Sequence, residues 1–493
     1  MFKKVLIANR GEIAVRIIRT CRDMGIKTVA VYAPSDQDSL HVRLADESLP
    51  LRSPERYADA EALLATARAT GAEAIHPGYG FVAENAAFAA MCQETGVVFI
   101  GPSPATLARF ERKAAMLTTA DEAGFCTPPH TDACFDAQDE QALTAAAAGL
   151  GYPVVIKSCR GGRGRGTRLA FRAERLAELV RNAQAEAQRI YGDSLVYLER
   201  AVWPAYHVDV QILADHHGHI IHLGERCSSL QQHNQKLITE TPAPCLTPRQ
   251  RQHVCQAAVN LARLFDFRGA GTVEFLVGSE GTACFSDFKG RIQVEHPTTE
   301  MVSGVDIVAE QLAIAAGQPL RLRQEDVNLS GWAMQCRINA EDPWNHFLPS
   351  PGILHRFRLP GGLNVRVDTY GYGGCIVPVR YDSLLALVVT WAEDRAACIR
   401  RMQRALQDFV ILGVQTNAAL HQRIVEHPDF IDGRYDTDFI HHAQLADPAP
   451  LADLSDVAIA AAVAYERRNK TPRPVQPQRL QSGWHRSLRQ LPV

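Results

Sequence analysis

The first hundred residues alternate short apolar runs with helical patterns, and this alternation constrains the fold more than any other feature. The apolar runs are KKVLIAN, KTVAVYA, AEAIHPG and VVFIGP, and helical patterns lie between them. Strands separated by helices at this spacing are joined by right-handed crossovers, which pair the strands in parallel and place helices on both faces of the sheet. The sequence therefore predicts an N-terminal doubly wound parallel sheet, a fold that binds ligands beyond its strand ends.

Length, charge and cysteine spacing narrow the class of protein. A chain of 493 residues is too long for one hydrophobic core, so we expect several domains. The formal net charge of -2 gives no basic field for nucleic acid. No apolar run reaches the roughly 20 residues that a membrane span needs. The opening MFKKVLIANRGE lacks a signal peptide pattern, so we expect a cytoplasmic protein. Twelve cysteines without a C-x-x-C pair predict neither a disulfide framework nor a zinc site.

A glycine- and arginine-rich loop follows the N-terminal region. Two alanine-rich helical patterns, separated by TPPH at 127–130, lead into YPVVIKSCRGGRGRGTRLAF, which predicts a hairpin of two strands around that loop. Its backbone amides, together with Arg160, Arg163, Arg165 and Arg168, suit a phosphate chain. The alternative is an exposed basic hairpin that contacts RNA or nothing.

Two acidic residues lie in neighbouring strand patterns further along the chain. Glu274 in GTVEFL and Asp287 in CFSDFK each stand among apolar residues. Paired carboxylates beside a nucleotide loop are the ligands that Mg²⁺ needs when it binds a triphosphate.

The stretch RIQVEHPTTE at 291–300 carries a possible acid–base group. Alternation with Ile292 and Val294 predicts a strand that places Arg291, Gln293 and Glu295 on one face. An arginine fork binds a carboxylate, bicarbonate or phosphate, and a nearby glutamate accepts its proton. The alternative is a solvated strand face with a local ion pair.

Six motifs, in order along the chain, carry a family resemblance. They are ANRGEIAVRIIR (8–19), HPGYGFVAEN (76–85), IKS with a following glycine loop (156), RIQVEHPTTE (291), CRINAEDP (336–343) and FLPSPG (347–352). The chain resembles the biotin carboxylase family of ATP-grasp enzymes from residue 2 to about 440. The resemblance implies an α/β and α+β multidomain fold: an N-terminal biotin carboxylase domain (1–112), an ATP-grasp domain (113–322) with a mobile lid (about 130–203), a C-terminal biotin carboxylase domain (323–445) and a basic, proline-rich tail (446–493).

The resemblance also implies a reaction and its partners. In that family, ATP with Mg²⁺ or Mn²⁺ activates bicarbonate as carboxyphosphate, and the ureido nitrogen of biotin is then carboxylated. The chain has no A-M-K-M-like biotin attachment motif, so we expect the biotin on a separate carrier protein, with carboxyltransferase subunits as further partners. A homodimer is implied, with Arg16 and Arg19 at the subunit contact.

The site residues implied by the resemblance fall into three groups. The nucleotide contacts are Lys113, Lys157, Gly164, Gly166, Glu199, Arg200, Ala201, Val202, His207, Gln231, Asn234 and Leu276, and the metal ligands are Glu274 and Asp287. The bicarbonate and biotin site consists of Lys236, Arg291, Gln293, Val294, Glu295 and Arg337, of which Lys236, Arg291, Glu295 and Arg337 are the catalytic residues. Glu295 is expected to deprotonate bicarbonate, while Arg291 and Arg337 stabilise the charge on the ureido oxygen.

Five positions, at four places in the chain, depart from the family pattern. Arg160 and Arg163 interrupt a glycine-only loop, Asn234 replaces a histidine, Asp287 replaces a glutamate, and Lys289 replaces an asparagine metal ligand. An ammonium has no lone pair for a metal. Lys289 therefore either turns out to solvent or occupies the place of a second ion. Two hypotheses follow: a working biotin carboxylase, and a catalytically weakened relative acting as a regulatory or assembly subunit.

The tail is expected to contain an alanine-rich helix, AAVAYERR, followed by a basic, proline-rich segment. Such segments are typical of disordered linkers. The alternative is docking onto the carrier or the carboxyltransferase, with Trp484 as the anchor.

Overall fold

The computed structural model describes the chain except residues 52–55, 137–139, 161–166, 233, 448–454 and 471–493. The chain divides into two compact units, Met1–Ala446 and Asp447–Val493. The second unit contains the predicted alanine-rich helix, α16 (Ser455–Lys470). Trp484 and the proline-rich segment lie outside the described residues. Among the described helices, none is long and apolar enough to cross a bilayer.

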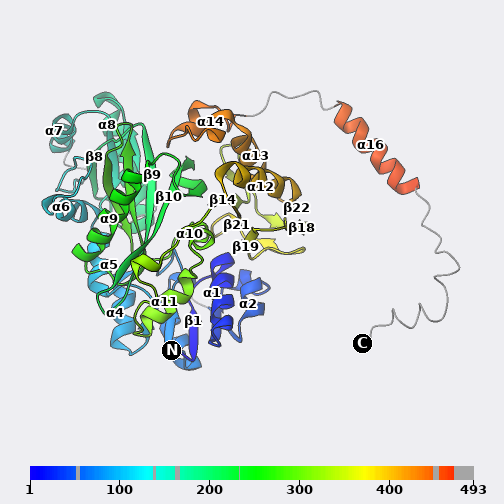
Figure 1. Cartoon of the computed structure of the whole chain (residues 1–493), viewed down its shortest axis with the longest axis horizontal. Helices are drawn as coiled ribbons and strands as arrows, with labels where there is room; N and C mark the ends of the chain where they lie inside the picture. Colours follow the sequence, from blue (N-terminus) through cyan, green and yellow to red (C-terminus); the bar gives the residue numbers. More distant parts are fainter. Residues whose placement is uncertain (52–55, 137–139, 161–166, 233, 448–454, 471–493) are drawn as a thin grey trace. The chain divides into compact units, whose positions relative to one another are not determined.

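The N-terminal region is a parallel sheet with strand order β3-β2-β1-β4-β5, as the alternation predicts. Its strands are β1 (Lys4–Ile7), β2 (Lys27–Tyr32), β3 (Glu47–Pro50), β4 (Ala74–His76) and β5 (Val98–Phe99), and its helices are α1 (Gly11–Asp23), α2 (Leu40–Leu44), α3 (Ala60–Thr70), α4 (Ala86–Glu94) and α5 (Pro104–Glu111). Successive residues of β1 enter different cores: Val5 packs with residues of α1, and Leu6 packs with residues of α3 and α4. Both faces of the sheet are therefore covered (Figure 1).

An eight-stranded sheet forms the centre of the first unit, in the order β13-β12-β9-β10-β11-β14-β21-β19. The strands are β9 (Ala205–Ala214), β10 (Ile220–Gln232), β11 (Gln235–Thr241), β12 (Gly269–Gly278), β13 (Ala283–Lys289), β14 (Trp332–Asn339), β19 (Val365–Thr369) and β21 (Leu384–Ala392). Three helices lie between these strands in the sequence: α9 (Pro248–Leu264) between β11 and β12, and α10 (His296–Ser303) and α11 (Ile307–Ala315) between β13 and β14. One continuous sheet thus joins the segments expected to form the second and third domains.

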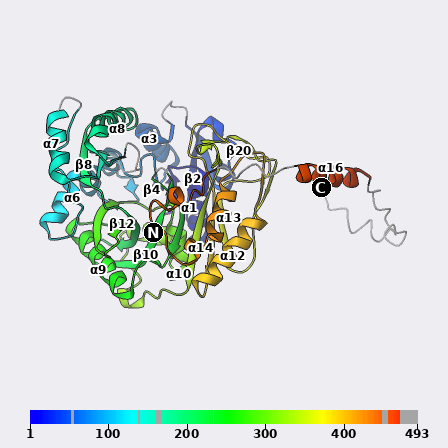
Figure 2. The same cartoon turned by 90° about the horizontal axis from the view of Figure 1, so that it is seen from above.

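A smaller sheet, β7-β6-β8, forms the unit predicted around the glycine- and arginine-rich loop. It consists of β6 (Val154–Ser158), β7 (Arg168–Ala170) and β8 (Val196–Arg200), with α6 (Lys113–Glu122) before it and α7 (Glu140–Leu150) and α8 (Leu176–Tyr191) beside it. The strands β6 and β7 pair antiparallel, which confirms the predicted hairpin. Figures 1 and 2 both place α7 and α8 on the opposite side of the unit from α12 and α13.

The C-terminal part of the first unit packs helices on β14 and β21. The remaining elements are β15 (Glu341–Asp342), β16 (Leu348–Pro349), β17 (Gly352–Ile353), β18 (Arg356–Arg358), β20 (Ile376–Val377), β22 (Val410–Leu412), α12 (Arg395–Asp408), α13 (Ala418–Glu426), α14 (Pro428–Ile431) and α15 (Phe439–His442). Met402 and Leu406 of α12 are buried in the same core as Met334 and Val388. This packing fixes β14, the strand that carries Arg337.

The predicted strand at 291–295 is wrong. The segment is a turn, in which the His296 amide donates to the Gln293 carbonyl at 3.2 Å, and it leads directly into α10. Pro297 lies in the first turn of that helix, where a missing amide hydrogen costs nothing. Local alternation of polar and apolar residues is the same for a strand and for this turn, so the pattern alone did not distinguish them.

The prediction of no disulfides is also wrong. Disulfides join Cys126 to Cys284 and Cys134 to Cys159. Cys126 and Cys284 are separated by 158 residues in the sequence, and they meet because the linker before the small sheet runs beside β13, where the Phe285 amide donates to the Cys126 carbonyl at 2.7 Å. Spacing along the chain cannot reveal such a pair.

Candidate functional site

A cavity of about 780 Å³ collects residues from both sheets and from the turn at 291–295. The predicted site residues that line it are Lys113, Lys157, Glu199, Arg200, Ala201, Val202, His207, Gln231, Asn234, Lys236, Glu274, Leu276, Asp287, Arg291, Gln293, Val294, Glu295 and Arg337. Gly164 and Gly166 lie outside the described residues. The cavity thus unites the basic hairpin, the paired acids and the RIQVE segment, which are far apart in the sequence.

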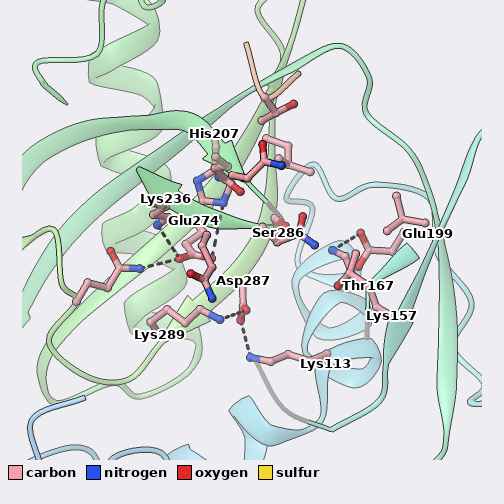
Figure 3. Close-up of a pocket in the computed structure, with 18 of the residues that line it drawn as sticks. Lys113, Lys157, Thr167, Glu199, His207, Lys236, Glu274, Ser286, Asp287 and Lys289 are labelled. Carbon is pink, nitrogen blue, oxygen red and sulfur yellow. Dashed lines mark hydrogen bonds and ion pairs between the residues drawn. The ribbon is translucent and has the colours of Figure 1, made fainter. Parts of the chain in front are cut away.

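Two carboxylates face each other at what we call the Asp287 end of the cavity, comprising Lys113, Glu274, Asp287 and Lys289. In the antiparallel pairing of β12 and β13, Glu274 lies directly opposite Asp287. Lys113 Nζ donates to Asp287 Oδ1 at 2.6 Å, and Lys289 Nζ donates to Asp287 Oδ2 at 2.5 Å (Figure 3). Burial alone would raise the pKa of Asp287, but Lys113 and Lys289 outweigh it and the pKa is lowered. Both acids are therefore ionised at neutral pH, the state that a metal ligand requires.

Glu274 is held by neighbours from two further segments. Its Oε1 accepts Gln293 Nε2 at 2.6 Å and Lys236 Nζ at 3.2 Å. Burial opposes ionisation, but Lys236 and Lys289 lower the pKa of Glu274 to about 2. Glu274 and Asp287 offer oxygen donors that fit Mg²⁺.

Lys289 does not turn out to solvent, because only 5% of the residue is exposed. Burial opposes its charge, yet Asp287, Glu274 and Glu84 raise its pKa, so it stays an ammonium. This settles the alternative left by the sequence: Lys289 points into the cavity beside the carboxylates.

Glu295 lies at what we call the Glu295 end, comprising Lys236, Arg291, Gln293, Val294, Glu295 and Arg337. Glu295 is 1% exposed, and Arg337 Nη2 donates to its Oε1. Burial alone would raise the pKa of Glu295, but Arg337 and then Lys236 outweigh it and the pKa is lowered. The carboxylate is thus ionised and ready to accept a proton.

Arg291 is oriented by a residue that the sequence reasoning missed. Its Nε lies 3.2 Å from Glu84 Oε2, and its Nη1 donates to the Ile292 carbonyl at 3.0 Å. Glu84 ends the HPGYGFVAE stretch, which is the signal that could have identified it, since an acid there follows a glycine-rich turn at a strand end. The pair joins the N-terminal sheet to the cavity.

Arg226 is a second residue that the sequence analysis did not identify, and it supports the turn at 291–295 through a hydrogen bond to Gln293. It is fully buried on β10, and its guanidinium donates to Gln293 Oε1 at 2.8 Å and to Gln211 Oε1 at 2.8 Å. It also donates to Thr272 and Thr299, at 3.1 and 2.9 Å. Burying an arginine is costly unless its donors are hydrogen-bonded, and these four bonds engage both Nη atoms of Arg226, although its Nε has no partner among the described residues. The bond to Gln293 Oε1 fixes the Gln293 side chain. An arginine within a strand pattern was the available signal.

The small sheet contributes the other wall of the cavity. Lys157 on β6 donates to Glu199 Oε2 at 2.7 Å, and Tyr197 donates to Glu199 Oε1 at 2.7 Å. Glu199 is 1% exposed, so this lysine–glutamate pair forms within the wall. Asn234, which replaces a family histidine, has φ of 60°, a left-handed conformation that asparagine tolerates well.

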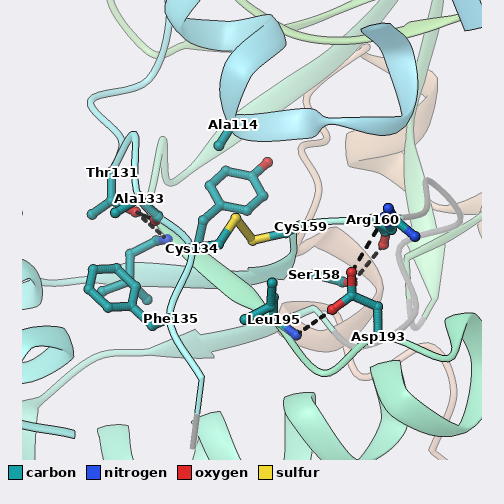
Figure 4. Close-up of a disulfide and its surroundings, with 12 residues drawn as sticks. Ala114, Thr131, Ala133, Cys134, Phe135, Ser158, Cys159, Arg160, Asp193 and Leu195 are labelled. Carbon is teal, nitrogen blue, oxygen red and sulfur yellow. Dashed lines mark hydrogen bonds and ion pairs between the residues drawn. A yellow bond between two sulfur atoms is a disulfide. The ribbon is translucent and has the colours of Figure 1, made fainter. Parts of the chain in front are cut away.

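A disulfide stands where β6 leads into the glycine- and arginine-rich loop (Figure 4). Cys159 directly follows β6 and is bonded to Cys134. The next residue, Arg160, has its Nε 3.5 Å from Asp193 Oδ2, and its carbonyl accepts Ser158 Oγ at 2.6 Å. The start of the loop is thus tied to the small sheet.

The two arginines expected at a subunit contact differ in their surroundings. Arg16 is buried, and its Nη2 lies 2.9 Å from Glu300 Oε1 and 2.9 Å from Asp306 Oδ1. Arg19 is exposed. Arg16 therefore orders the α1, α10 and α11 region from within, and its contact with a second subunit stays a prediction.

Three family descriptions match successive parts of the chain. They are "Biotin carboxylase, N-terminal domain" at residues 1–107, "Carbamoyl-phosphate synthase L chain, ATP binding domain" at 112–323 and "Biotin carboxylase C-terminal domain" at 335–442. Biotin carboxylase 1 of Bacillus subtilis is 45% identical over 444 residues, covering 89% of this chain and 98% of that protein. Biotin carboxylase of Pseudomonas aeruginosa is 44% identical over 436 residues, covering 88% and 96%.

Solved structures agree with the sequence relatives. The biotin carboxylase domain dimer of Hydrogenobacter thermophilus 2-oxoglutarate carboxylase, in complex with MgADP, ADP and bicarbonate, superposes with a TM-score of 0.88 at 41% identity, covering 91% of this chain and 100% of that chain. A biotin carboxylase–ATP complex from Campylobacter jejuni gives 0.86 at 38% identity, covering 90% and 99%. On its three matched domains, its fold and its relatives, the chain belongs to the biotin carboxylase family.

Proposed function

We propose that this protein carboxylates biotin, using ATP and bicarbonate, and that Lys236, Arg291, Glu295 and Arg337 carry the reaction. The observation that carries the proposal is the placement of a buried, ionised Glu295 between Arg337 and Lys236, in the same cavity as the paired acids and Lys113. One end thus has a base and cations for a small oxyanion, and the other has groups suited to a triphosphate.

The reaction uses Glu295 as the proton acceptor. Glu295 takes the bicarbonate proton, and a carbonate oxygen forms a bond to the γ-phosphorus of ATP while the bond to the β-phosphate oxygen breaks, giving carboxyphosphate and ADP. Arg291, oriented by Glu84, binds the oxyanion bidentately. Lys236 has a raised pKa, because Asp209, Glu274 and Glu295 outweigh its burial, so it keeps its positive charge beside bicarbonate.

Biotin then accepts the carboxyl group. Carboxyphosphate breaks down to carbon dioxide and phosphate, and the phosphate takes the proton of the ureido nitrogen. That nitrogen then forms the new carbon–nitrogen bond to carbon dioxide. Arg291 and Arg337 stabilise the negative charge on the ureido oxygen. When bound by Glu274 and Asp287, Mg²⁺ neutralises charge on the ATP phosphates.

We further propose a separate biotin carrier protein, carboxyltransferase partners and a homodimer, in the cytoplasm where ATP is plentiful. The dimer named for the Hydrogenobacter thermophilus domain supports the homodimer.

The test is bicarbonate-dependent ATP hydrolysis with and without free biotin, together with carboxybiotin formation from labelled bicarbonate. We expect hydrolysis to require bicarbonate and to rise with biotin. Glu295→Gln should abolish both activities, while Glu310→Gln, which changes a buried carboxylate outside the cavity, should preserve them. ATP hydrolysis that ignores bicarbonate would contradict the proposal and favour the weakened-subunit hypothesis.

A further inference from the structure

Lys289 lies beside the paired acids Glu274 and Asp287 in the cavity. Asp287 and Lys289 are two residues apart on β13, so both side chains leave the same face of the strand. Glu274 lies opposite Asp287 on β12. The ammonium of Lys289 therefore belongs to the same cluster as the two carboxylates, as Figure 3 shows.

Both oxygens of Asp287 are already engaged by ammonium groups. Lys113 Nζ lies 2.6 Å from Oδ1 and Lys289 Nζ lies 2.5 Å from Oδ2. An ion that bound Asp287 would have to displace one of these contacts. Lys113 comes from α6, across the cavity, and it is the residue expected to follow the ATP phosphates when they bind. Lys289, in contrast, lies on β13, the strand that also carries Asp287.

The surroundings of Lys289 keep it in place. The adjacent Phe288 is fully buried and stacks on Phe110 with ring centroids 4.6 Å apart. The next residue, Gly290, is so close to Phe110 and Pro102 that an added Cβ would lie 3.1 Å from each. The backbone on both sides of Lys289 is therefore fixed, so its side chain leaves the strand on the side of Asp287 and the cavity.

The donor set fits one Mg²⁺ and does not fit two. Glu274 and Asp287 supply carboxylate oxygens, but Lys289 supplies three N–H donors and no lone pair. An ammonium also repels a dication at close range. We infer that Lys289 is a resident cation that replaces one of two metal ions, so that ATP is bound with a single divalent ion. This inference rests on the proposed use of ATP, and it concerns how the nucleotide charge is neutralised.

The resident cation has a consequence for metal dependence. An enzyme that needs a free Mg²⁺ in addition to MgATP responds to Mg²⁺ in excess of ATP, whereas one that needs MgATP alone saturates when ATP is fully complexed. We expect the second behaviour for this protein. We expect Lys289 to donate to phosphate oxygens when the nucleotide binds, since an ammonium carries three N–H donors.

The experiment counts ions directly. Mn²⁺ is titrated into the full-length protein with a non-hydrolysable ATP analogue, and bound Mn²⁺ is measured by electron paramagnetic resonance. We expect one ion per nucleotide for the unaltered protein and for Lys289→Arg, which keeps the charge. Lys289→Asn, which restores an oxygen ligand, should bind two, and Lys289→Met, which removes the charge without adding a ligand, should bind the second at least tenfold more weakly than Lys289→Asn.

Two tightly bound ions in the unaltered protein, or a single ion in Lys289→Asn, would overturn the inference. Thermal melting of each variant shows whether it folds, and the unaltered protein with Lys289→Arg suffices if Lys289→Asn does not. Because the measurement needs nucleotide binding and no turnover, its failure is distinguishable from failure of the proposed carboxylation. A protein without carboxylase activity but with one bound ion would leave this inference standing.

Discussion

The two ends of the cavity hold their charges differently. At the Glu295 end, Glu295 pairs with Arg337 and Arg291 pairs with Glu84, each across distant segments, while Lys236 contacts the carboxylates of Asp209 and Glu274. At the Asp287 end, one carboxylate contacts two ammonium groups.

The difference shows what each end is prepared to bind. At the Glu295 end, the pairing with Arg337 keeps the Glu295 carboxylate ionised. Arg291 and Arg337 can exchange their carboxylate partners for a small oxyanion when it binds. The two ammonium groups that contact Asp287 suit a polyphosphate, which brings its own negative charges. Two of the departures expected from the family resemblance, Asp287 and Lys289, also lie at this end. The following substitutions test this contrast.

Arg291→Ala should give the largest loss. Removing one preorganised charge at a developing oxyanion costs roughly 10²–10³-fold in kcat. We expect biotin carboxylation to fall by that factor while the KM for ATP changes less than about threefold, because Arg291 does not belong to the Asp287 end. Steady-state kinetics with each substrate varied measures both. Arg291→Lys is the control that keeps the charge but loses the fork, and an equal loss in ATP affinity would contradict the separation of the two ends.

Lys157→Ala should weaken the binding of ATP without changing the binding of bicarbonate. Loss of one charge-assisted phosphate contact is expected to raise the KM for ATP by at least roughly tenfold, with the KM for bicarbonate unchanged. Lys157 pairs with Glu199 in the cavity wall, so Lys157→Arg serves as the control that preserves this pair. An unchanged KM for ATP would show that the small sheet is not the nucleotide wall.

Arg337→Met should move the pH dependence of bicarbonate-dependent ATP hydrolysis. Burial raises the pKa of Glu295, and Arg337 is the strongest of the groups that lower it. Removing Arg337 therefore raises that pKa, so Glu295 becomes protonated at higher pH and the acidic limb of kcat/KM shifts upward. Arg337→Lys should restore most of the original profile. A limb that stays in place would mean that another group acts as the base.

Reduction of the Cys134–Cys159 disulfide should have the smallest effect on catalysis. Its loop of 25 residues corresponds to about 3 kcal/mol of stabilisation from restricted chain entropy. We expect dithiothreitol, or Cys134→Ser, to lower the melting temperature while the KM for ATP rises no more than about threefold, and the KM for bicarbonate stays constant. Cys126→Ser is the comparison, since that disulfide lies outside the small sheet. A large change in bicarbonate affinity would contradict the independence of the two ends.

Several features were predictable from the sequence because they depend on local order. The parallel sheet follows from strands and helices alternating at short spacing, and the hairpin β6–β7 follows from two apolar runs around a loop. Glu274 and Asp287 were predicted as a pair because each stood in a neighbouring strand pattern, and the β12–β13 register places them opposite each other. Most of the site residues predicted from the family motifs line one cavity, and their individual roles are predictions that the substitutions above test.

Tertiary structure decided everything that depends on contacts between distant segments. The sequence named Lys289 as an obstacle to metal binding, but only its burial and its contact with Asp287 show that it lies in the cavity. Glu84 and Arg226 acquire their roles from partners more than 60 residues away, at Arg291 and Gln293. Cys126 and Cys284 meet only because the linker runs beside β13. Local patterns fix which way a side chain leaves its own strand or turn, whereas the charge or thiol it meets there is set by how separate elements pack.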